Sequence, residues 1–357
     1  DKNLICSNQN PKDKRIFYLI PNSVTHLIFG VNFNQELEPG DIPNSVNHLT
    51  FDNFSDKKLK YGVIPNSVTH LTFGYSFNQK LEPDVIPNSV THLKFGWKFN
   101  QILEPGVIPN SVTHLTFGNN FNQKLNPGDI PNSVTHLTFG TFFNQDLKLG
   151  VIPDSVTHLI FGDNFNGLLE PGAIPNSVIY LTFGNSFNQI LRIEKSRQIK
   201  YVIPKSVKYL TFGINFNQTL KPEDIPNSIT HLIFSCKYKP IEEGVIPDSV
   251  THLTFGYYFN QKLNKGIIPN SVKYLTFGNN FNQILKPGDI PKSVIHLTFG
   301  YEFNQPLKYN VIPNSVTHLT FGNNYNQPLI FEKKKQIKNS NNNFKKKNKY
   351  VKIIDSI

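Results

Sequence analysis

The chain has 357 residues, and its 36 Lys and Arg against 25 Asp and Glu give a formal net charge of +11. Thirty residues are Phe, one is Trp and none is Met, so one recurring aromatic residue must build most of the core. The two cysteines, Cys6 and Cys236, exclude a disulfide framework and a cysteine-rich zinc motif, and no apolar run is long enough to cross a bilayer as a helix.

Most of the chain is one repeated motif. Residues 1–19 precede its first full copy, and we expect them to form an N-terminal cap or the remnant of an earlier coil, because Phe17 and Leu19 resemble the end of a coil. From residue 20 to residue 330 the motif recurs fourteen times, and eleven of the thirteen steps between copies are 22 residues long. A fixed period in this range indicates a solenoid, so we expect one elongated domain whose coils stack on their neighbours.

The first full copy predicts a strand in every coil. Residues 26–29 should form it, with Leu27 and Phe29 pointing inward and His26 and Ile28 pointing outward. All fourteen copies keep Leu and Phe at the two inward positions. The stacked strands should therefore form a parallel sheet that is buried on one face.

The residues on either side of the strand predict turns. Ser23 recurs in every copy, and we expect its hydroxyl to cap backbone amides of the turn before the strand. Gly30, after the strand, is expected to provide positive φ. Pro39 and Gly40 give a further turn signal, and Pro and Gly are so frequent here that we expect extended or 3₁₀ return segments.

These residues carry a resemblance to a known family. The spacing Val24-x-x-Leu27-x-Phe29 resembles a leucine-rich repeat, and the recurring Phe33-Asn34 and Ile42-Pro43 pairs resemble the FNIP repeat, a related family of social amoebae and giant viruses. The resemblance implies a mainly β, leucine-rich-repeat-like solenoid of about fourteen 22-residue coils, and a general binding role. Some family members carry an F-box or a kinase domain beside the repeats, and the sequence contains neither. The family has no defined catalytic residues to carry over.

The first outward position of the strand forms a ladder of flat rings. All eleven histidines occupy it: His26, His48, His70, His92, His114, His136, His158, His231, His252, His296 and His318. The other three copies have Tyr180, Tyr209 and Tyr274 there. Because Tyr replaces His, and because Thr25 and Ile28 offer no partner group for a metal-bound imidazole, we expect a structural ladder and no metal.

The ladder should be sensitive to acid. Neighbouring imidazolium charges one strand spacing apart repel by roughly 1 to 3 kcal/mol. Mutual repulsion is therefore expected to lower the pKa values and to destabilise the fold below about pH 6.

Repetition argues against catalysis. Asp154, Ser155 and His158 invite a hydrolase interpretation, yet Ser and His recur in nearly every coil and no nucleophile elbow is present. We expect no enzyme and no cofactor.

The variable residues are the better functional candidates. We call the two residues after the strand glycine the exit edge, and they differ between copies while the core does not. Its aromatic members are Tyr75, Trp97, Phe142, Tyr257, Tyr258 and Tyr301. An exposed aromatic row suits a partner surface. Asn occupies the same positions in other copies, so drift at a permissive position is an equal alternative. Tyr75 and Trp97 are the best pair because their coils are adjacent.

Three copies depart from the motif. Residues 51–54 lose the strand glycine, residues 192–198 add an insertion, and residues 235–240 lose the Phe-Asn pair. Insertions in solenoids form loops on one face, sometimes the binding face. Decay of the repeat is the alternative.

The tail concentrates the charge. Residues 331–357 hold nine Lys and two acids, a net charge of +7, which leaves +4 for the preceding 330 residues. We therefore expect no nucleic acid along the array. The Lys/Asn-rich tail should be disordered and contact anionic surfaces only weakly.

The sequence favours a non-enzymatic scaffold that binds a protein partner through the outward sheet face and the exit edge. A structural or adhesive surface protein is the alternative, and a substrate-recognition part of a ubiquitin-ligase adaptor follows from family analogy alone. We expect a cytoplasmic location. Secretion stays open because Asp1 is not an initiator, although the sequons at Asn53 and Asn217 have little weight in an Asn-rich chain.

Overall fold

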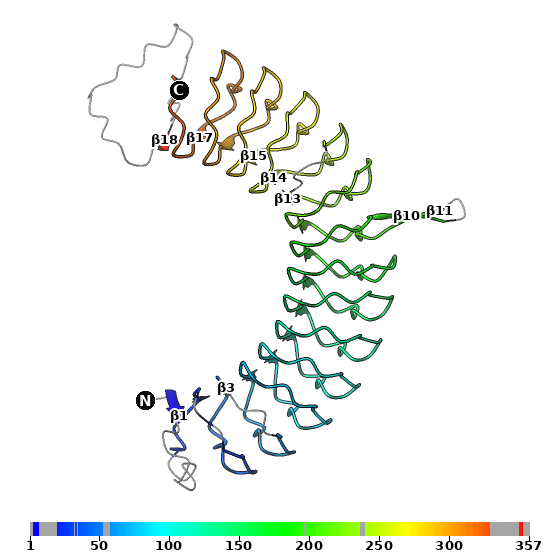
Figure 1. Ribbon diagram of the computed structural model, residues 1–357, viewed down its shortest axis with the longest axis vertical. Helices are drawn as coiled ribbons and strands as arrows, with labels where there is room; N and C mark the ends of the chain where they lie inside the picture. The colour runs from blue at the N-terminus through cyan, green and yellow to red at the C-terminus, as the bar shows by residue number, and fades with distance from the viewer. Residues whose placement is uncertain are drawn as a thin grey trace, which may run out of the picture. The chain divides into compact units, whose positions relative to one another are not determined.

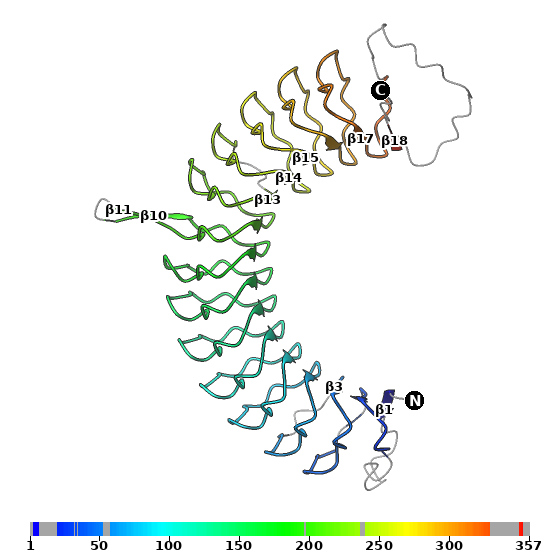
Figure 2. The same cartoon turned by 180° about the vertical axis from the view of Figure 1, so that it is seen from behind.

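The computed structural model describes residues 3–6, 20–31, 33, 35–52, 58–195, 198–235, 240–328 and 350–352 (Figures 1 and 2). The chain divides into two compact units, Asp1–Gly184 and Asn185–Ile357. The sequon at Asn53, Cys236 and most of the tail lie outside the described residues, as do Phe17 and Leu19. The division of the chain into an N-terminal cap (residues 1–19), a repeat array (20–330) and a tail (331–357) therefore stays a proposal.

The first unit is a stack of coils that each contribute one strand. Its strands are β1 (Asn3–Cys6), β2 (His26–Phe29), β3 (His48–Phe51), β4 (His70–Thr72), β5 (His92–Lys94), β6 (His114–Thr116), β7 (His136–Thr138), β8 (His158–Ile160) and β9 (Tyr180–Thr182). Each strand pairs in parallel with the next, and equivalent repeat positions face each other.

The second unit continues the pattern after an antiparallel hairpin. The hairpin is β10 (Arg192–Lys195) and β11 (Gln198–Tyr201), and the parallel strands are β12 (Tyr209–Thr211), β13 (His231–Phe234), β14 (His252–Phe255), β15 (Tyr274–Thr276), β16 (His296–Thr298) and β17 (His318–Thr320). Strand β18 (Tyr350–Lys352), from the tail, pairs antiparallel with β17. In both units the strands follow one side of the stack and the return segments the other (Figure 1).

The predicted fold class is confirmed. All fourteen copies of the motif contribute a strand at the expected His or Tyr position, and the described residues contain no helix. The return segments are extended stretches joined by turns and bends, one of the two expected conformations. The fold is a leucine-rich-repeat-like β-solenoid.

Strand β1 was not predicted. Leu4 pairs with Leu27 and Cys6 pairs with Phe29, so residues 3–6 form the strand of an earlier coil. The segment Asn3–Cys6 lacks the His or Tyr and the Phe that mark the fourteen repeat strands, which explains why the motif did not reveal it.

The core is a continuous aromatic stack. In one coil Val68, Leu71, Phe73 and Phe77 are each at most 2% exposed. The rings of Phe73 and Phe77 lie 4.3 Å apart, and Phe73 stacks on Phe95 of the next coil at 5.6 Å. Burying one such ring stabilises the fold by about 2 to 3 kcal/mol, and the rings of neighbouring coils contribute to that burial. Stacking between coils therefore holds each coil in place.

The glycine after the strand is required for a different reason from the one predicted. Gly118 does not have positive φ, but a Cβ atom there would overlap the carbonyl oxygen of Gly96. The left-handed conformation belongs to the turn glycine of the return segment, such as Gly128 with φ of 95°. The strand glycine thus permits close approach of successive coils, and the turn glycine permits the bend.

The recurring Ser also differs from its expected role. The Ser67 hydroxyl donates to the Val46 carbonyl of the previous coil at 2.6 Å, and Ser89 donates to Val68 in the same way. It does not cap backbone amides. In ten coils the Ser therefore ties one coil to the one before it, whereas the hydroxyls of Ser45 and Ser315 have no hydrogen-bond partner among the described residues.

The Asn of the Phe-Asn pair forms a second tie. The Asn122 amide donates to Oδ1 of Asn100 at 2.9 Å, and Nε2 of Gln123 donates to the Asn100 carbonyl at 3.0 Å. The same contacts recur between Asn122 and the next coil, at Asn144 and Gln145. The Asn-Gln part of the motif thus replaces sheet hydrogen bonds on the return side.

Candidate functional site

The predicted ladder of flat rings is present in both units. In the first unit seven imidazoles and Tyr180 stack in sequence, with ring centroids 4.1 Å apart for His26 and His48 and 4.2 Å apart for His158 and Tyr180. In the second unit the stack includes Tyr209 and Tyr274, with distances from 4.0 to 4.6 Å. The interplanar angles are 6° to 16°, except for 27° between Tyr209 and His231, so Tyr continues the stack in place of His.

Nine of the eleven ladder histidines follow a Thr whose partnership the sequence did not suggest. The Thr hydroxyl lies beside the imidazole, with Oγ1 of Thr91 3.0 Å from Nδ1 of His92. Asn47 takes this place at His48, whereas His296 follows Ile295. The Thr91 hydroxyl also lies 3.2 Å from the Thr69 carbonyl of the previous coil. The same pair recurs at Thr25 and His26. The Thr therefore fixes the ring orientation and leaves one ring nitrogen, Nε2, as the free end.

The ladder does not resemble a metal centre. Within the described residues no group of three or more His, Cys, Asp or Glu side chains is arranged to hold a metal ion. The stacked rings face one another rather than a common point, which is the geometry of packing and not of coordination.

Burial is the main cause of the lowered histidine pKa values. Desolvation, followed by the charge of neighbouring ladder histidines, holds the pKa of His70, His92 and His136 below the ordinary value. The pKa values of five more are lowered in the same direction with desolvation first: His48, His158, His231, His252 and His296. The predicted direction is present, but repulsion is the second cause rather than the first.

The exit edge of the first unit carries an aromatic pair. The rings of Tyr75 and Trp97 stack with centroids 5.8 Å apart, and the side chains are 50% and 42% exposed. The ammonium group of Lys98 lies 5.6 Å from the centre of the Tyr75 ring. The Lys98 amide also donates to the Tyr75 carbonyl at 2.9 Å, which holds the two coils together at this edge.

A shallow groove of about 560 Å³ runs along the same edge. Tyr75 and Trp97 line it together with the second outward strand residue of six coils: Thr50, Thr72, Lys94, Thr116, Thr138 and Ile160. The groove therefore combines hydroxyls, the ammonium group of Lys94, the carboxylates of Asp52 and Asp163, and the rings of Tyr75 and Trp97.

The other aromatic candidates are separate from this pair. Phe142 is 46% exposed and does not line the groove. In the second unit Tyr257 and Tyr258 meet edge to face at 4.8 Å, and Tyr301 is 46% exposed. Three of the six candidates thus lie in the first unit and three in the second, and only Tyr75 and Trp97 line the groove.

The insertion at residues 192–198 forms the hairpin β10–β11, which projects from the return side of its unit (Figure 2). Nε of Arg192 donates to Oδ1 of Asp224 at 2.8 Å, and the Tyr201 hydroxyl donates to Glu223 at 2.7 Å. The base of the hairpin is therefore fixed to the following coil.

The family model for the FNIP Repeat matches residues 18–54, 54–98, 99–142, 143–186, 167–215, 187–237, 239–280, 281–324 and 303–332. The chain belongs to the FNIP repeat family. This agrees with the resemblance that the recurring Phe-Asn and Ile-Pro pairs carry.

Two solved structures are similar to this FNIP repeat protein. One is CroV588, described as a novel circular LRR protein, with 46% identity and a TM-score of 0.75 over 87% of this chain. This chain covers 48% of CroV588, about half of its length. The other is YopM, a leucine-rich effector protein from Yersinia pestis, with 16% identity and a TM-score of 0.36 over 85% of this chain and 84% of that chain. No curated protein matches the chain.

The chain is thus a repeat solenoid of the leucine-rich-repeat type, a fold that is typically non-catalytic and typically mediates protein–protein interactions. Among the described residues no helix has the length and apolarity needed to cross a membrane.

Proposed function

We propose that this FNIP repeat protein is a non-enzymatic scaffold that binds a protein partner through the outward sheet face and the exit edge of its first unit. The observation that carries the proposal is the stacked, half-exposed pair Tyr75 and Trp97. Large aromatic side chains at the centre of a groove are the residues that dominate binding energy at protein interfaces.

Folding does not require aromatic residues at this position. The next coils have Asn119, Thr141 and Asp163 there, and the backbone hydrogen bonds of the edge continue past them, as from Phe142 to the Asn119 carbonyl at 2.8 Å. Tyr75 and Trp97 are exposed apolar surface that the coil itself does not use. Covering them with a partner would remove that surface from water.

The outward sheet face supplies the polar part of the surface. The Thr hydroxyls of the second outward row and the exposed ammonium group of Lys94 lie beside the aromatic pair in one groove. An aromatic centre with a polar surround is the usual arrangement of a specific protein interface. A cytoplasmic location belongs to the same proposal.

The test is affinity capture with matched variants. The double variant Tyr75→Ala and Trp97→Ala should lose the proteins that the unsubstituted chain retains, as measured by quantitative mass spectrometry. Tyr301→Ala is the control, because Tyr301 occupies the position of Tyr75 in a coil of the second unit. If the double variant keeps every specifically captured protein, this edge is not the binding surface, and the structural or adhesive role would be preferred.

A further inference from the structure

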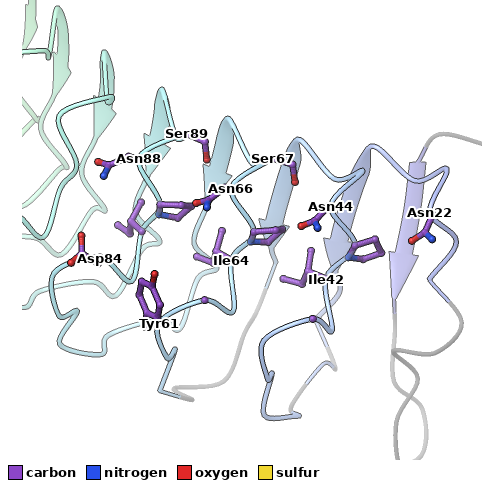
Figure 3. A pocket seen from close by; sticks show the side chains of 16 residues that line it. Asn22, Ile42, Asn44, Tyr61, Ile64, Asn66, Ser67, Asp84, Asn88 and Ser89 are labelled. Carbon is purple, nitrogen blue, oxygen red and sulfur yellow. The ribbon is translucent and has the colours of Figure 1, made fainter.

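The first unit has a second, larger groove at the turns that precede the strands, at the opposite end of the strands from the exit edge. Its volume is about 1240 Å³. One wall is a row of Asn side chains from four successive turns, Asn22, Asn44, Asn66 and Asn88 (Figure 3). Tyr61 lies on the other side of the groove.

The Asn side chains of this row have no structural task in the described part of the chain. All four are exposed, and they make no hydrogen bond to another described residue. Their turns are closed by the backbone, as from Val68 to the Pro65 carbonyl at 3.0 Å. Where Lys205 replaces Asn, the same bond forms between Val207 and Pro204 at 3.3 Å. The row therefore offers unused amides, each with donors and an acceptor.

The rest of the groove is flat and almost uncharged. Tyr61 is 75% exposed, so the face of its ring is available. Asp84 is the only charged residue among those that line the groove. Ile42, Ile64 and Ile86 also line it but are at most 3% exposed, so they leave no apolar pocket for an anchoring side chain. This chemistry disfavours a protein hot spot and a polyanion alike.

We propose that the groove of Asn22, Asn44, Asn66, Asn88 and Tyr61 binds a linear, uncharged polysaccharide. Amides pair with sugar hydroxyls as donor and acceptor, and an exposed Tyr ring packs against the C–H face of a pyranose. The turns that carry these amides lead into paired strands ~4.8 Å apart, a spacing close to the length of one sugar unit in an extended chain. The site is independent of the exit edge and does not rest on the proposed function.

The experiment is isothermal titration of the full chain with cellohexaose and chitohexaose, and with a hexamer of galacturonic acid as the charged probe. We expect at least one neutral hexamer to bind and the charged probe not to bind. Tyr61→Ala and the double variant Asn44→Ala and Asn66→Ala should each weaken that binding about tenfold or more, the loss of one or two hydrogen bonds or of one stacking contact.

Tyr309→Ala is the matched control, since Tyr309 occupies the repeat position of Tyr61 in the second unit and is 49% exposed. The Tyr309→Ala variant should bind the neutral hexamer with the affinity of the unsubstituted chain. All variants should melt at the same temperature, because the changed side chains are exposed. The proposal is overturned if neither neutral hexamer binds, if the charged hexamer binds more tightly, or if Tyr61→Ala and Tyr309→Ala have equal effects.

Discussion

The imidazoles of His70 and His92 stack with their centroids 4.2 Å apart and an interplanar angle of 12°. They belong to adjacent parallel strands at equivalent repeat positions, so sheet pairing itself sets their distance. Each ring is partly buried between its two neighbours. Protonating one of them therefore places a charge where water is scarce and a second imidazole is near.

The stability of the solenoid should fall in mild acid. The lowered pKa values mean that the unfolded chain binds more protons than the folded chain near pH 6, so the free energy of unfolding rises with pH. The stability that the neutral histidines contribute is fully present above pH 6.5, the ordinary histidine pKa. It is lost as the pH falls below that value toward the lowered pKa values of the folded chain. Melting temperatures at pH 7.5 and pH 5 should differ, with the lower value in acid.

The variant His92→Tyr is the matched control for this pH effect. Tyr180 already stacks on His158 at 4.2 Å, so a Tyr ring fits the ladder. The variant should fold and should lose less stability between pH 7.5 and pH 5, because one titrating group is gone. A melting temperature that is the same at both pH values in the unsubstituted chain would contradict the account.

Gly118→Ala should be strongly destabilising. The added methyl group would overlap the Gly96 carbonyl oxygen, and backbone on both sides would have to move apart. We expect a loss of about 3 kcal/mol or more in denaturant unfolding. Gly128→Ala is the control, since its Cβ would meet nothing within 4 Å and only its φ of 95° is unfavourable, at about 1 to 2 kcal/mol. Equal losses in the two variants would show that close approach of the coils is not the reason for the strand glycine.

Asn100→Ala should weaken the tie between two coils. It removes the Oδ1 atom that accepts from the Asn122 amide at 2.9 Å and from Nε2 of Gln123 at 3.1 Å. Because a partly buried backbone amide is left without its partner, the expected loss is about 1 to 2 kcal/mol. Asn110→Ala changes the exposed turn Asn of the next coil and should stay within about 0.5 kcal/mol of the unsubstituted chain. Unfolding curves that rank the two variants in the opposite order would refute this role for the Phe-Asn pair.

Much of each coil could be predicted, because the alignment of equivalent residues in successive coils follows directly from the repeat. The alternation of His26, Leu27 and Phe29 gives the strand and its buried face, and β2 has the expected bounds. Proximity of Tyr75 and Trp97 also follows, since they lie 22 residues apart in neighbouring coils.

The contacts between coils could not be predicted in this way. The roles of Gly118 and Ser67 depend on atoms of the previous coil, and one repeat read by itself suggests only a local turn. The groove at Tyr61 has the same cause, because it is formed by turns whose spacing and exposure exist only in the stack. Strand β1 was missed since its residues do not follow the motif although its backbone does.

The most direct test of partner binding at the exit edge is a site-specific photo-crosslink. A photoreactive amino acid replaces Trp97 in one variant and Tyr301 in another, and both chains are irradiated with the proteins captured by the unsubstituted chain. We predict a defined crosslinked product at position 97 that the prior substitution Tyr75→Ala reduces. The absence of any product at position 97, together with unchanged capture of the same proteins, would contradict the claim that this edge binds the partner.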